Sequence, residues 1–227
     1  MIYPLDSSII ILIPAILFAL YAQNKVKRTF AKFLRVSTRK GFSGRDVART
    51  TLDQNNLQNI QVEMAQGYLS DHYDPRLRVL RLSREVYQGT SVASVSVAAH
   101  EVGHAIQHAN GYVPLSLRNA IFPIARFGSS MAWFFVIGGF IFDSLGMIDL
   151  GILLYLAAVM FQVITLPVEF NASNRAMQLL TDNGFITNDE VSSSRKVLNA
   201  AALTYVAAMA TAIAQLLRLI LLRNRRS

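Results

Sequence analysis

The chain has 227 residues, of which 52% are hydrophobic and only 16% are charged, with a net charge of +8. Since about 25% of the residues of a soluble globular protein are charged, this composition is too apolar for an ordinary soluble domain and favours a membrane protein with one water-exposed part. The absence of cysteine excludes disulfides and thiolate metal sites, so any metal must be bound by His, Asp or Glu.

The first apolar stretch, residues 7–22, is followed by a strongly basic segment. Residues 24–49 contain nine Lys and Arg against the single acid Asp46. Positive charges after an apolar stretch are typical of an uncleaved membrane anchor whose N-terminus is outside and whose basic flank is cytoplasmic. No nucleic-acid-binding motif and no aromatic interleaving accompany the basic residues, so we expect no nucleic-acid partner.

Three further apolar stretches, at residues 127–142, 148–168 and 197–222, predict about four transmembrane helices in total. The acidic loop 143–149 is typical of an outside turn. Four spans that start outside place the C-terminus outside, whereas the three arginines of the tail favour the inside. Either the tail crosses despite its charge, or the last helix does not cross fully.

The water-exposed part lies between the first two apolar stretches. Ser43 with Asp46 is an N-cap signal, and Asn110–Gly111 is a helix stop. Alternating apolar residues predict strands. The expected elements are a helix over 43–57, strands over 60–64 and 77–82, a turn over 70–75 and a helix over 91–109. The predicted fold class is therefore α+β, a mostly helical integral membrane protein with a small cytoplasmic part that contains a short sheet.

The segment His100-Glu101-Val102-Gly103-His104 carries the pattern H-E-x-x-H on the last of these helices. Two histidines four positions apart project from one face of a helix, so both imidazoles can reach one Zn²⁺ at about 2.0–2.1 Å. Zinc lowers the pKa of a coordinated water toward neutrality, and Glu101 can accept the proton and carry it to a leaving amine. The alternative is a solvent-facing helix with coincidental spacing, but the apolar flanks argue against it. The pattern thus predicts a zinc-dependent hydrolase with Glu101 as general base.

The third zinc ligand must come from elsewhere. His108 would lie about 12 Å along the helix from His100, too far for one metal, so we expect it to be a surface or packing residue. Glu169 ends the third apolar stretch, where an acid is costly unless it is paired, wet or metal-bound. Two histidines and one glutamate with an open fourth position form the thermolysin arrangement. The alternative for Glu169 is an interfacial acid paired with Arg175.

The residues that would contact the transition state are less defined. His72 lies in the expected turn, where it either faces the cleft or is simply solvated. The donor that stabilises the oxyanion is not singled out by any motif. The candidates are His72, Arg175 and Tyr205.

The chain resembles the YugP-type membrane zinc metallopeptidases of bacteria over nearly its whole length. The resemblance rests on the segments at 98–107 (AAHEVGHAIQ), 166–176 (LPVEFNASNRA) and 197–206 (VLNAAALTYV). A looser likeness is to HtpX-like and CAAX-prenyl membrane proteases, which pair an H-E-x-x-H helix with a downstream Glu-aromatic-x-Ala-Asp motif. This likeness implies a zincin-like part in which zinc is bound by His100, His104 and Glu169.

One position departs from that motif. The acid expected four residues after Glu169 is Ser173 here. In the likened proteases this acid orients a metal-binding histidine. Ser173 can accept the same hydrogen bond, but more weakly.

These observations predict a zinc-dependent endopeptidase of the bacterial cell membrane, with Zn²⁺ as cofactor, an active site facing the cytoplasm and membrane-associated polypeptides as substrates. The HtpX likeness implies membrane-protein quality control, and an exposed sheet edge could pair with an extended peptide. The alternative is a non-catalytic membrane scaffold, although a structural metal site needs no general base. The predicted division is an anchor at 1–23, a metallopeptidase part at 24–118 and membrane helices at 119–227, which carry the third-ligand segment 166–176.

Overall fold

The computed structural model describes residues 7–225, and their contacts divide them into two compact units. The first, which we call the helical unit, comprises residues 7–23, Val113–Pro167 and 204–225. The second, which we call the sheet unit, comprises residues 24–112 and 168–203.

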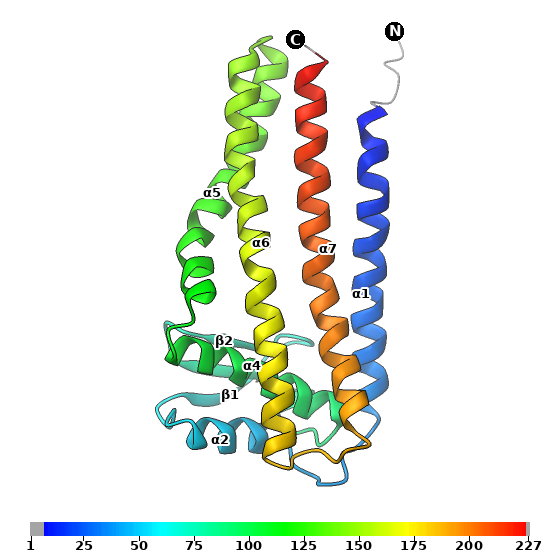
Figure 1. The fold of residues 1–227 in the computed structure, drawn as a ribbon, viewed down its shortest axis with the longest axis vertical. Coiled ribbons are helices and arrows are strands. Elements are labelled where there is room, and N and C mark those ends of the chain that lie inside the picture. Colours follow the sequence, from blue (N-terminus) through cyan, green and yellow to red (C-terminus); the bar gives the residue numbers. More distant parts are fainter. Residues whose placement is uncertain (1–6, 226–227) are drawn as a thin grey trace. The chain divides into compact units, whose positions relative to one another are not determined.

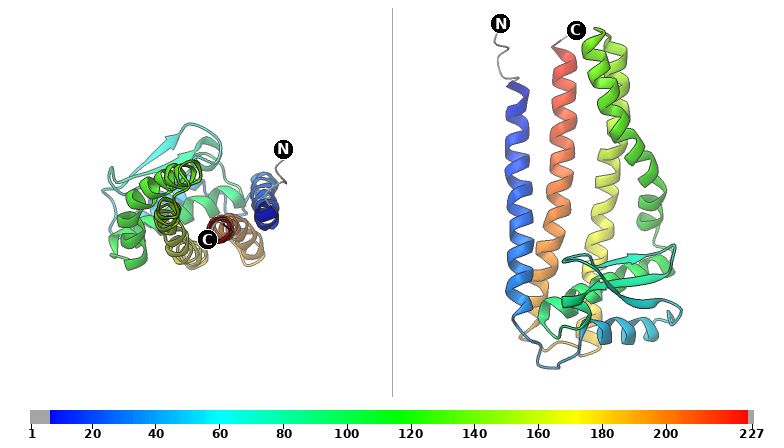
Figure 2. Two further views of the ribbon diagram at one scale, coloured as in Figure 1. Left: turned by 90° about the horizontal axis from the view of Figure 1, so that it is seen from above. Right: turned by 180° about the vertical axis from the view of Figure 1, so that it is seen from behind.

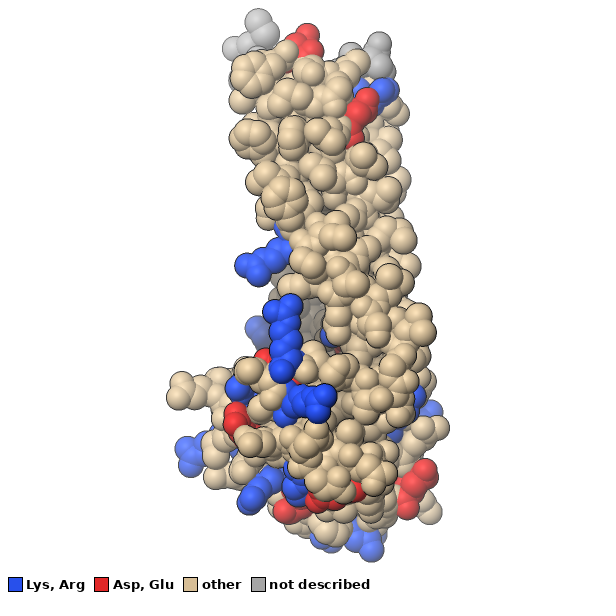
Figure 3. All heavy atoms as spheres, turned by 90° about the vertical axis from the view of Figure 1, so that its left-hand side faces the viewer, with Lys and Arg blue, Asp and Glu red and all other residues tan. Residues whose placement is uncertain are grey.

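The helical unit is built from parts of four long apolar helices, which run side by side in Figures 1 and 2. Each of the four is long and apolar enough to cross a membrane. Their outward side chains are largely apolar, and Figure 3 shows a broad uncharged surface along this unit. This confirms the predicted mostly helical fold with four long apolar helices. The helices are α1 (Leu12–Leu34), which continues the short 3-10 turn η1 (Ser7–Ile11), α5 (Val113–Ile141), α6 (Leu145–Asp182) and α7 (Val191–Asn224).

Glycines bring α5 and α6 into backbone contact. A Cβ atom on Gly128 would lie 2.8 Å from the carbonyl oxygen of Leu154, and a Cβ atom on Gly151 would lie 2.8 Å from that of Ala132. Small residues allow such close approach between membrane helices, whose association gains little from the hydrophobic effect. The two helices therefore form a tight hairpin.

Polar contacts show which helix ends share one end of the helical unit. Arg223 near the end of α7 pairs with Asp149 near the start of α6, with 2.9 Å between Nε and Oδ1. Arg218 of α7 donates to the Ser8 hydroxyl at the start of the chain's helical part, at 3.3 Å. The end of α7, the start of α6 and the start of α1 are therefore neighbours.

The sheet unit places a three-stranded sheet beside helix α4 (Figure 2). The strands lie in the order β1-β3-β2, with β1 parallel and β2 antiparallel to the central strand. Its buried core includes Leu52, Leu80, Leu82 and Val102. The elements are α2 (Gly44–Gln54), β1 (Gln61–Ala65), β2 (His72–Asp74), β3 (Val79–Ser83), α3 (Arg84–Tyr87) and α4 (Val92–Ala109), joined by the parts of α1, α6 and α7 that belong to this unit.

The N-cap signal at Ser43 and the helix stop at Asn110 are confirmed. Ser43 and Asp46 form a capping box at the start of α2, and the Ser91 hydroxyl accepts from the Ser94 backbone N–H at the start of α4. Asn110 is the C-cap of α4, as expected. Satisfying backbone donors that have no partner inside the helix fixes where each helix begins.

The expected turn at 70–75 is wrong in its middle, because His72–Asp74 form the edge strand β2. These three residues pair with Arg81, Leu80 and Val79 of β3. Three residues are too few for a period-two pattern to be recognised, so the strand depends on its partner rather than on its own sequence.

Candidate metal centre

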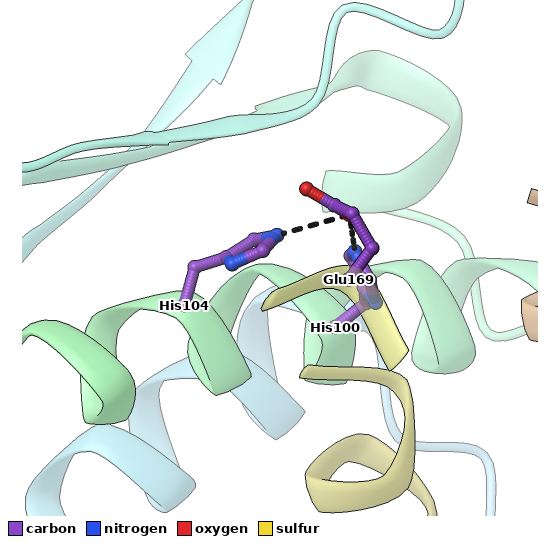
Figure 4. Close-up of side chains that lie close together, drawn as sticks. All are labelled: His100, His104 and Glu169. Carbon is purple, nitrogen blue, oxygen red and sulfur yellow. Dashed lines mark ion pairs between the residues drawn. The ribbon is translucent and has the colours of Figure 1, made fainter. Parts of the chain in front are cut away.

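The two histidines of the motif lie on consecutive turns of α4, with 4.8 Å between their ring centroids. Glu169 of α6 faces both, as Figure 4 shows. Its Oε2 atom lies 3.3 Å from the Nε2 atom of His100 and 3.5 Å from the Nε2 atom of His104. The structure therefore brings together all three residues that the sequence proposed as ligands, within the sheet unit.

The spacing of these three atoms fits a zinc ion. Tetrahedral ligands at about 2.0–2.1 Å from zinc lie about 3.3 Å from one another. The measured 3.3 and 3.5 Å agree with that value. The side chains are also withdrawn from water, with 12% of each histidine and 3% of the glutamate exposed. Such a buried carboxylate and imidazole pair is costly without a compensating cation, so the donor set, the distances and the burial all suit Zn²⁺.

Gly103 allows α4 to approach α6 closely enough to form this cluster. A Cβ atom at this position would lie 2.8 Å from the carbonyl oxygen of Ala172 and 3.3 Å from its Cα atom. Beside this contact, Ala99 of α4 and Ala176 of α6 are fully buried in one apolar cluster. The helices therefore meet backbone to backbone at the level of the site.

A chain of hydrogen bonds fixes His104. Its Nδ1 atom lies 3.0 Å from Oε1 of the fully buried Gln107. The Gln107 amide donates to the Val168 carbonyl at 2.8 Å and to Asn171 Oδ1 at 2.9 Å. Arg175 donates to the same Asn171 oxygen at 2.8 Å. Because an amide oxygen only accepts, Nδ1 of His104 carries a proton, so Nε2 on the side of Glu169 is the nitrogen that could bind a metal in the neutral ring.

The other histidine has a weaker partner. The Ser173 hydroxyl lies 3.3 Å from Nδ1 of His100, at the position where the sequence expected it. This distance is long for a hydrogen bond from or to a hydroxyl. The orientation of His100 thus depends more on the packing of α4 than that of His104 does.

Glu101 is held beside the cluster by the edge strand. Its Oε2 atom accepts a hydrogen bond from the backbone N–H of Tyr73 in β2, at 3.1 Å, and only 9% of the residue is exposed. The Tyr73 hydroxyl in turn lies 2.9 Å from Nδ1 of His108, which is exposed, as expected for a residue outside the ligand set. One strand thus contacts both the candidate base and the third histidine of the helix.

Two titratable side chains, His104 in the cluster and Asp71 in the same unit, have pKa values raised above their ordinary ranges. Burial disfavours the cation of His104, but the neighbouring carboxylate of Glu169 raises the pKa of this imidazole above its ordinary range. Burial raises the pKa of Asp71 to about 6, the nearby charge of Glu101 adds to this rise, and hydrogen bonds from the backbone N–H and hydroxyl of Ser83 oppose it. The carboxylates of Glu169 and Glu101 therefore both favour a positive charge at His104.

The candidate oxyanion donors have other partners or lie elsewhere in the chain. His72 is exposed, and its Nδ1 atom lies 2.8 Å from the carbonyl oxygen of Ser70 in its own segment. Arg175 donates to Asn171. Tyr205 belongs to the helical unit. A role for any of these residues in stabilising an oxyanion stays a prediction.

Sequence reasoning missed the groups that position the cluster. Gln107 follows His104 by three positions on the same helix, so an i, i+3 contact could have been expected. Tyr73 acts through its backbone N–H, which leaves no signal in the side chain. Asn171 could not be related to α4 before the fold was known.

Comparison with known proteins agrees with this geometry. Residues 8–224 match the protein family described as "Putative neutral zinc metallopeptidase". The chain is 49% identical over 214 residues to the "Putative membrane protease YugP" of Bacillus subtilis (strain 168), an alignment that covers 94% of this chain and 95% of that protein. No solved structure matches the chain. The resemblance found in the sequence is therefore confirmed, and the chain belongs to this family of neutral zinc metallopeptidases.

Proposed function

We propose that the chain is a zinc-dependent endopeptidase of the bacterial cell membrane, in which His100, His104 and Glu169 bind the metal and Glu101 is the general base. The observation that carries this proposal is the spacing of the two Nε2 atoms and the Oε2 atom, which suits the tetrahedral ligands of one zinc ion. The family supports the same chemistry.

The residues in and around the cluster have separate roles in the proposed reaction. Bound zinc would act as a Lewis acid and lower the pKa of a coordinated water. Glu101 takes the proton from the attacking water and returns it to the leaving amine. The Tyr73 N–H holds Oε2 of Glu101, so its other carboxylate oxygen is available for this proton. Gln107 and Ser173 keep the imidazole rings turned toward Glu169.

The substrates that we propose are membrane-associated polypeptides. Four candidate membrane spans in the same chain keep the site close to a bilayer. The strand β2 lies at the edge of the sheet and, among residues 7–225, pairs only with β3, and an edge strand is where an extended peptide can add to a sheet. The basic segment 24–49 supports a cytoplasmic location for the site, under the positive-inside rule.

A paired measurement of metal content and hydrolysis tests the proposal. In detergent or nanodiscs, Glu101→Gln should retain one zinc per chain yet lose hydrolysis of an unfolded membrane-protein substrate by about 10²–10⁴-fold, because only the proton carrier is removed. His100→Ala should lose the zinc as well. Glu85→Gln, a change of an exposed glutamate in the sheet unit, is the matched control and should alter neither quantity.

The alternative function, a non-catalytic membrane scaffold, makes the opposite expectation. It would show no zinc-dependent hydrolysis in the unmodified chain. Full hydrolysis by the Glu101→Gln variant would likewise remove Glu101 from its proposed role.

A further inference from the structure

The helical unit contains a cavity of about 470 Å³ that is lined by polar side chains and alanines. All of its lining residues lie on candidate membrane spans. Six of them carry hydrogen-bonding side chains, and the other five are alanines. The polar residues are Gln23, Ser129, Tyr155, Gln162, Thr204 and Thr211, and the alanines are Ala19, Ala158, Ala207, Ala208 and Ala212.

Three of the polar side chains are unsatisfied. Among residues 7–225, the side chains of Gln23, Tyr155 and Gln162 have no hydrogen-bond partner. Thr211, in contrast, donates back to the Ala207 carbonyl at 2.8 Å. In a bilayer an unpaired amide or hydroxyl has no water to replace the missing bond, which is costly. A molecule that supplies hydrogen-bonding groups would therefore be stabilised in this cavity.

The polar groups form two rows. Tyr155 and Gln162 lie two turns apart on α6, and Thr204 and Thr211 lie two turns apart on α7, so each row is about 10 Å long. Gln23 of α1 adds a third side to the wall. An amide both donates and accepts, so the rows suit a neutral partner of the same kind.

The residues of the cavity wall favour a polypeptide segment over a lipid as the occupant. No Lys, Arg, Asp or Glu lines the cavity, so it offers no positive charge to pair with a lipid phosphate. The five alanines leave room for the backbone of another helix to approach closely, as small residues do between membrane helices. A polypeptide segment satisfies both features, because it brings a helical backbone and neutral amide or hydroxyl side chains.

We propose that this cavity binds a membrane-spanning segment of the substrate through a neutral polar side chain, such as Asn, Gln, Ser or Thr. This rests on the proposed function only in taking the bound polypeptide to be a substrate. Recognition then depends on polar residues within a span, which stable single-span helices seldom carry. The cavity selects segments that are poorly suited to the bilayer.

The test measures binding without cleavage. The full chain carrying Glu101→Gln is placed in phosphatidylcholine nanodiscs, and fluorescence energy transfer reports its affinity for a leucine-rich membrane-spanning peptide. One probe has Asn at its centre, and the other has Leu there. The Asn peptide should bind about tenfold more tightly, the size expected for a hydrogen bond between membrane helices.

Matched variants test which side chains cause the preference for the Asn peptide. Gln162→Leu should reduce the preference for the Asn peptide to less than twofold, and Tyr155→Phe should weaken it. Gln178→Leu changes an exposed glutamine of the same helix outside the cavity and should leave it intact. Unchanged zinc content in each variant shows that the chain is folded.

Two results would overturn the proposal. One is equal affinity for the two peptides, or a preference that survives Gln162→Leu. The other is a lipid that remains bound in the cavity and is not displaced by the Asn peptide. Neither result bears on whether Glu101 and zinc support hydrolysis, so a failure here is distinct from a failure of the proposed function.

Discussion

Gln107 contacts several groups around the proposed metal centre, and no sequence motif predicted these contacts. It is fully buried, accepts from His104 and donates to two groups on α6. The same side chain therefore fixes the tautomer of His104 and ties this residue to α6, the helix that carries Glu169. Mutation of partners of this kind typically weakens metal affinity by about 10–100-fold.

We expect Gln107→Leu, which keeps the volume but removes the hydrogen bonds, to weaken zinc binding by about 10–100-fold. Competition with a chromophoric chelator measures this affinity directly. Gln58→Leu, at an exposed position of the sheet unit, serves as control. Equal affinity in the two variants would show that packing alone orients His104.

Asp71 is a carboxyl group whose burial disfavours its ionisation. Its pKa rises from 3.8 to about 6, mainly through burial. Between these two pH values the folded chain keeps a proton that the unfolded chain releases. The free energy of unfolding therefore falls as the pH rises through this window. The full shift corresponds to about 3 kcal/mol, an upper limit because the carboxyl is not fully buried.

Asp71→Asn should therefore stabilise the chain at pH 7 and give no gain at pH 4. An amide oxygen can still accept from the Ser83 backbone N–H, so the local contact is retained. The readout is the difference in Tm between variant and unmodified chain, both kept metal-free with chelator so that ligand titration cancels. A gain of equal size at both pH values would contradict the assigned pKa.

The motif residues were predictable because their chemistry demands their types and spacing. Two histidines one helical turn apart and an acid between them identify the helix face, and an acid at the end of an apolar stretch singles out Glu169. Nothing comparable marks Tyr73, whose contribution is a backbone group. Nothing marks Tyr155 and Gln162 either, because only the fold places them in the wall of one cavity.

At the scale of elements, the place where α4 packs against α6 determines how close Glu169 lies to the two histidines. Gly103 allows the two helices to approach at that place. We expect Gly103→Ala to force the Ala172 carbonyl away and to carry Glu169 from the histidines. Overpacking of this kind costs about 1–3 kcal/mol. Both Tm and zinc affinity should fall, although no ligand is altered.

Gly146→Ala is the control for this change. Gly146 lies in α6 with nothing within 4 Å of an added Cβ, so alanine should be tolerated or slightly stabilising. If Gly103→Ala behaved like this control, the helices would have room to spare at the site.

Apolar stretches located the long helices but not their ends. The third stretch ends at residue 168, yet α6 continues to Asp182, and α1 runs through basic residues to Leu34. Hydrophobicity marks what faces lipid or core, whereas a helix continues wherever its backbone bonds are kept. The strand β2 was missed for the opposite reason, since its three residues are stabilised by a partner strand and by Glu101.

For the whole molecule, the contacts of Arg223 bear on the open question of the tail. Its pairing with Asp149 places the end of α7 beside the start of α6, next to the acidic loop expected outside. A neutralised arginine weakens the case for an inside tail. The start of α1 and the end of α7 would then both lie outside.

Because the chain has no cysteine, single cysteines can map this topology without background. Phe142→Cys and Asn224→Cys should react with a membrane-impermeant maleimide on intact cells, whereas Gln58→Cys should react only after permeabilisation. Labelling of the 224 position only in permeabilised cells would mean that α7 does not cross.

The order of the proposed ligands along the chain has a consequence for biosynthesis. The imidazole pair and the base on α4 leave the ribosome first, and the carboxylate arrives only after α5 has been made and the chain has returned through α6. A nascent or truncated product therefore lacks a complete zinc site. On the proposed function, synthesis of the α5–α6 hairpin would therefore be the step that completes the active site.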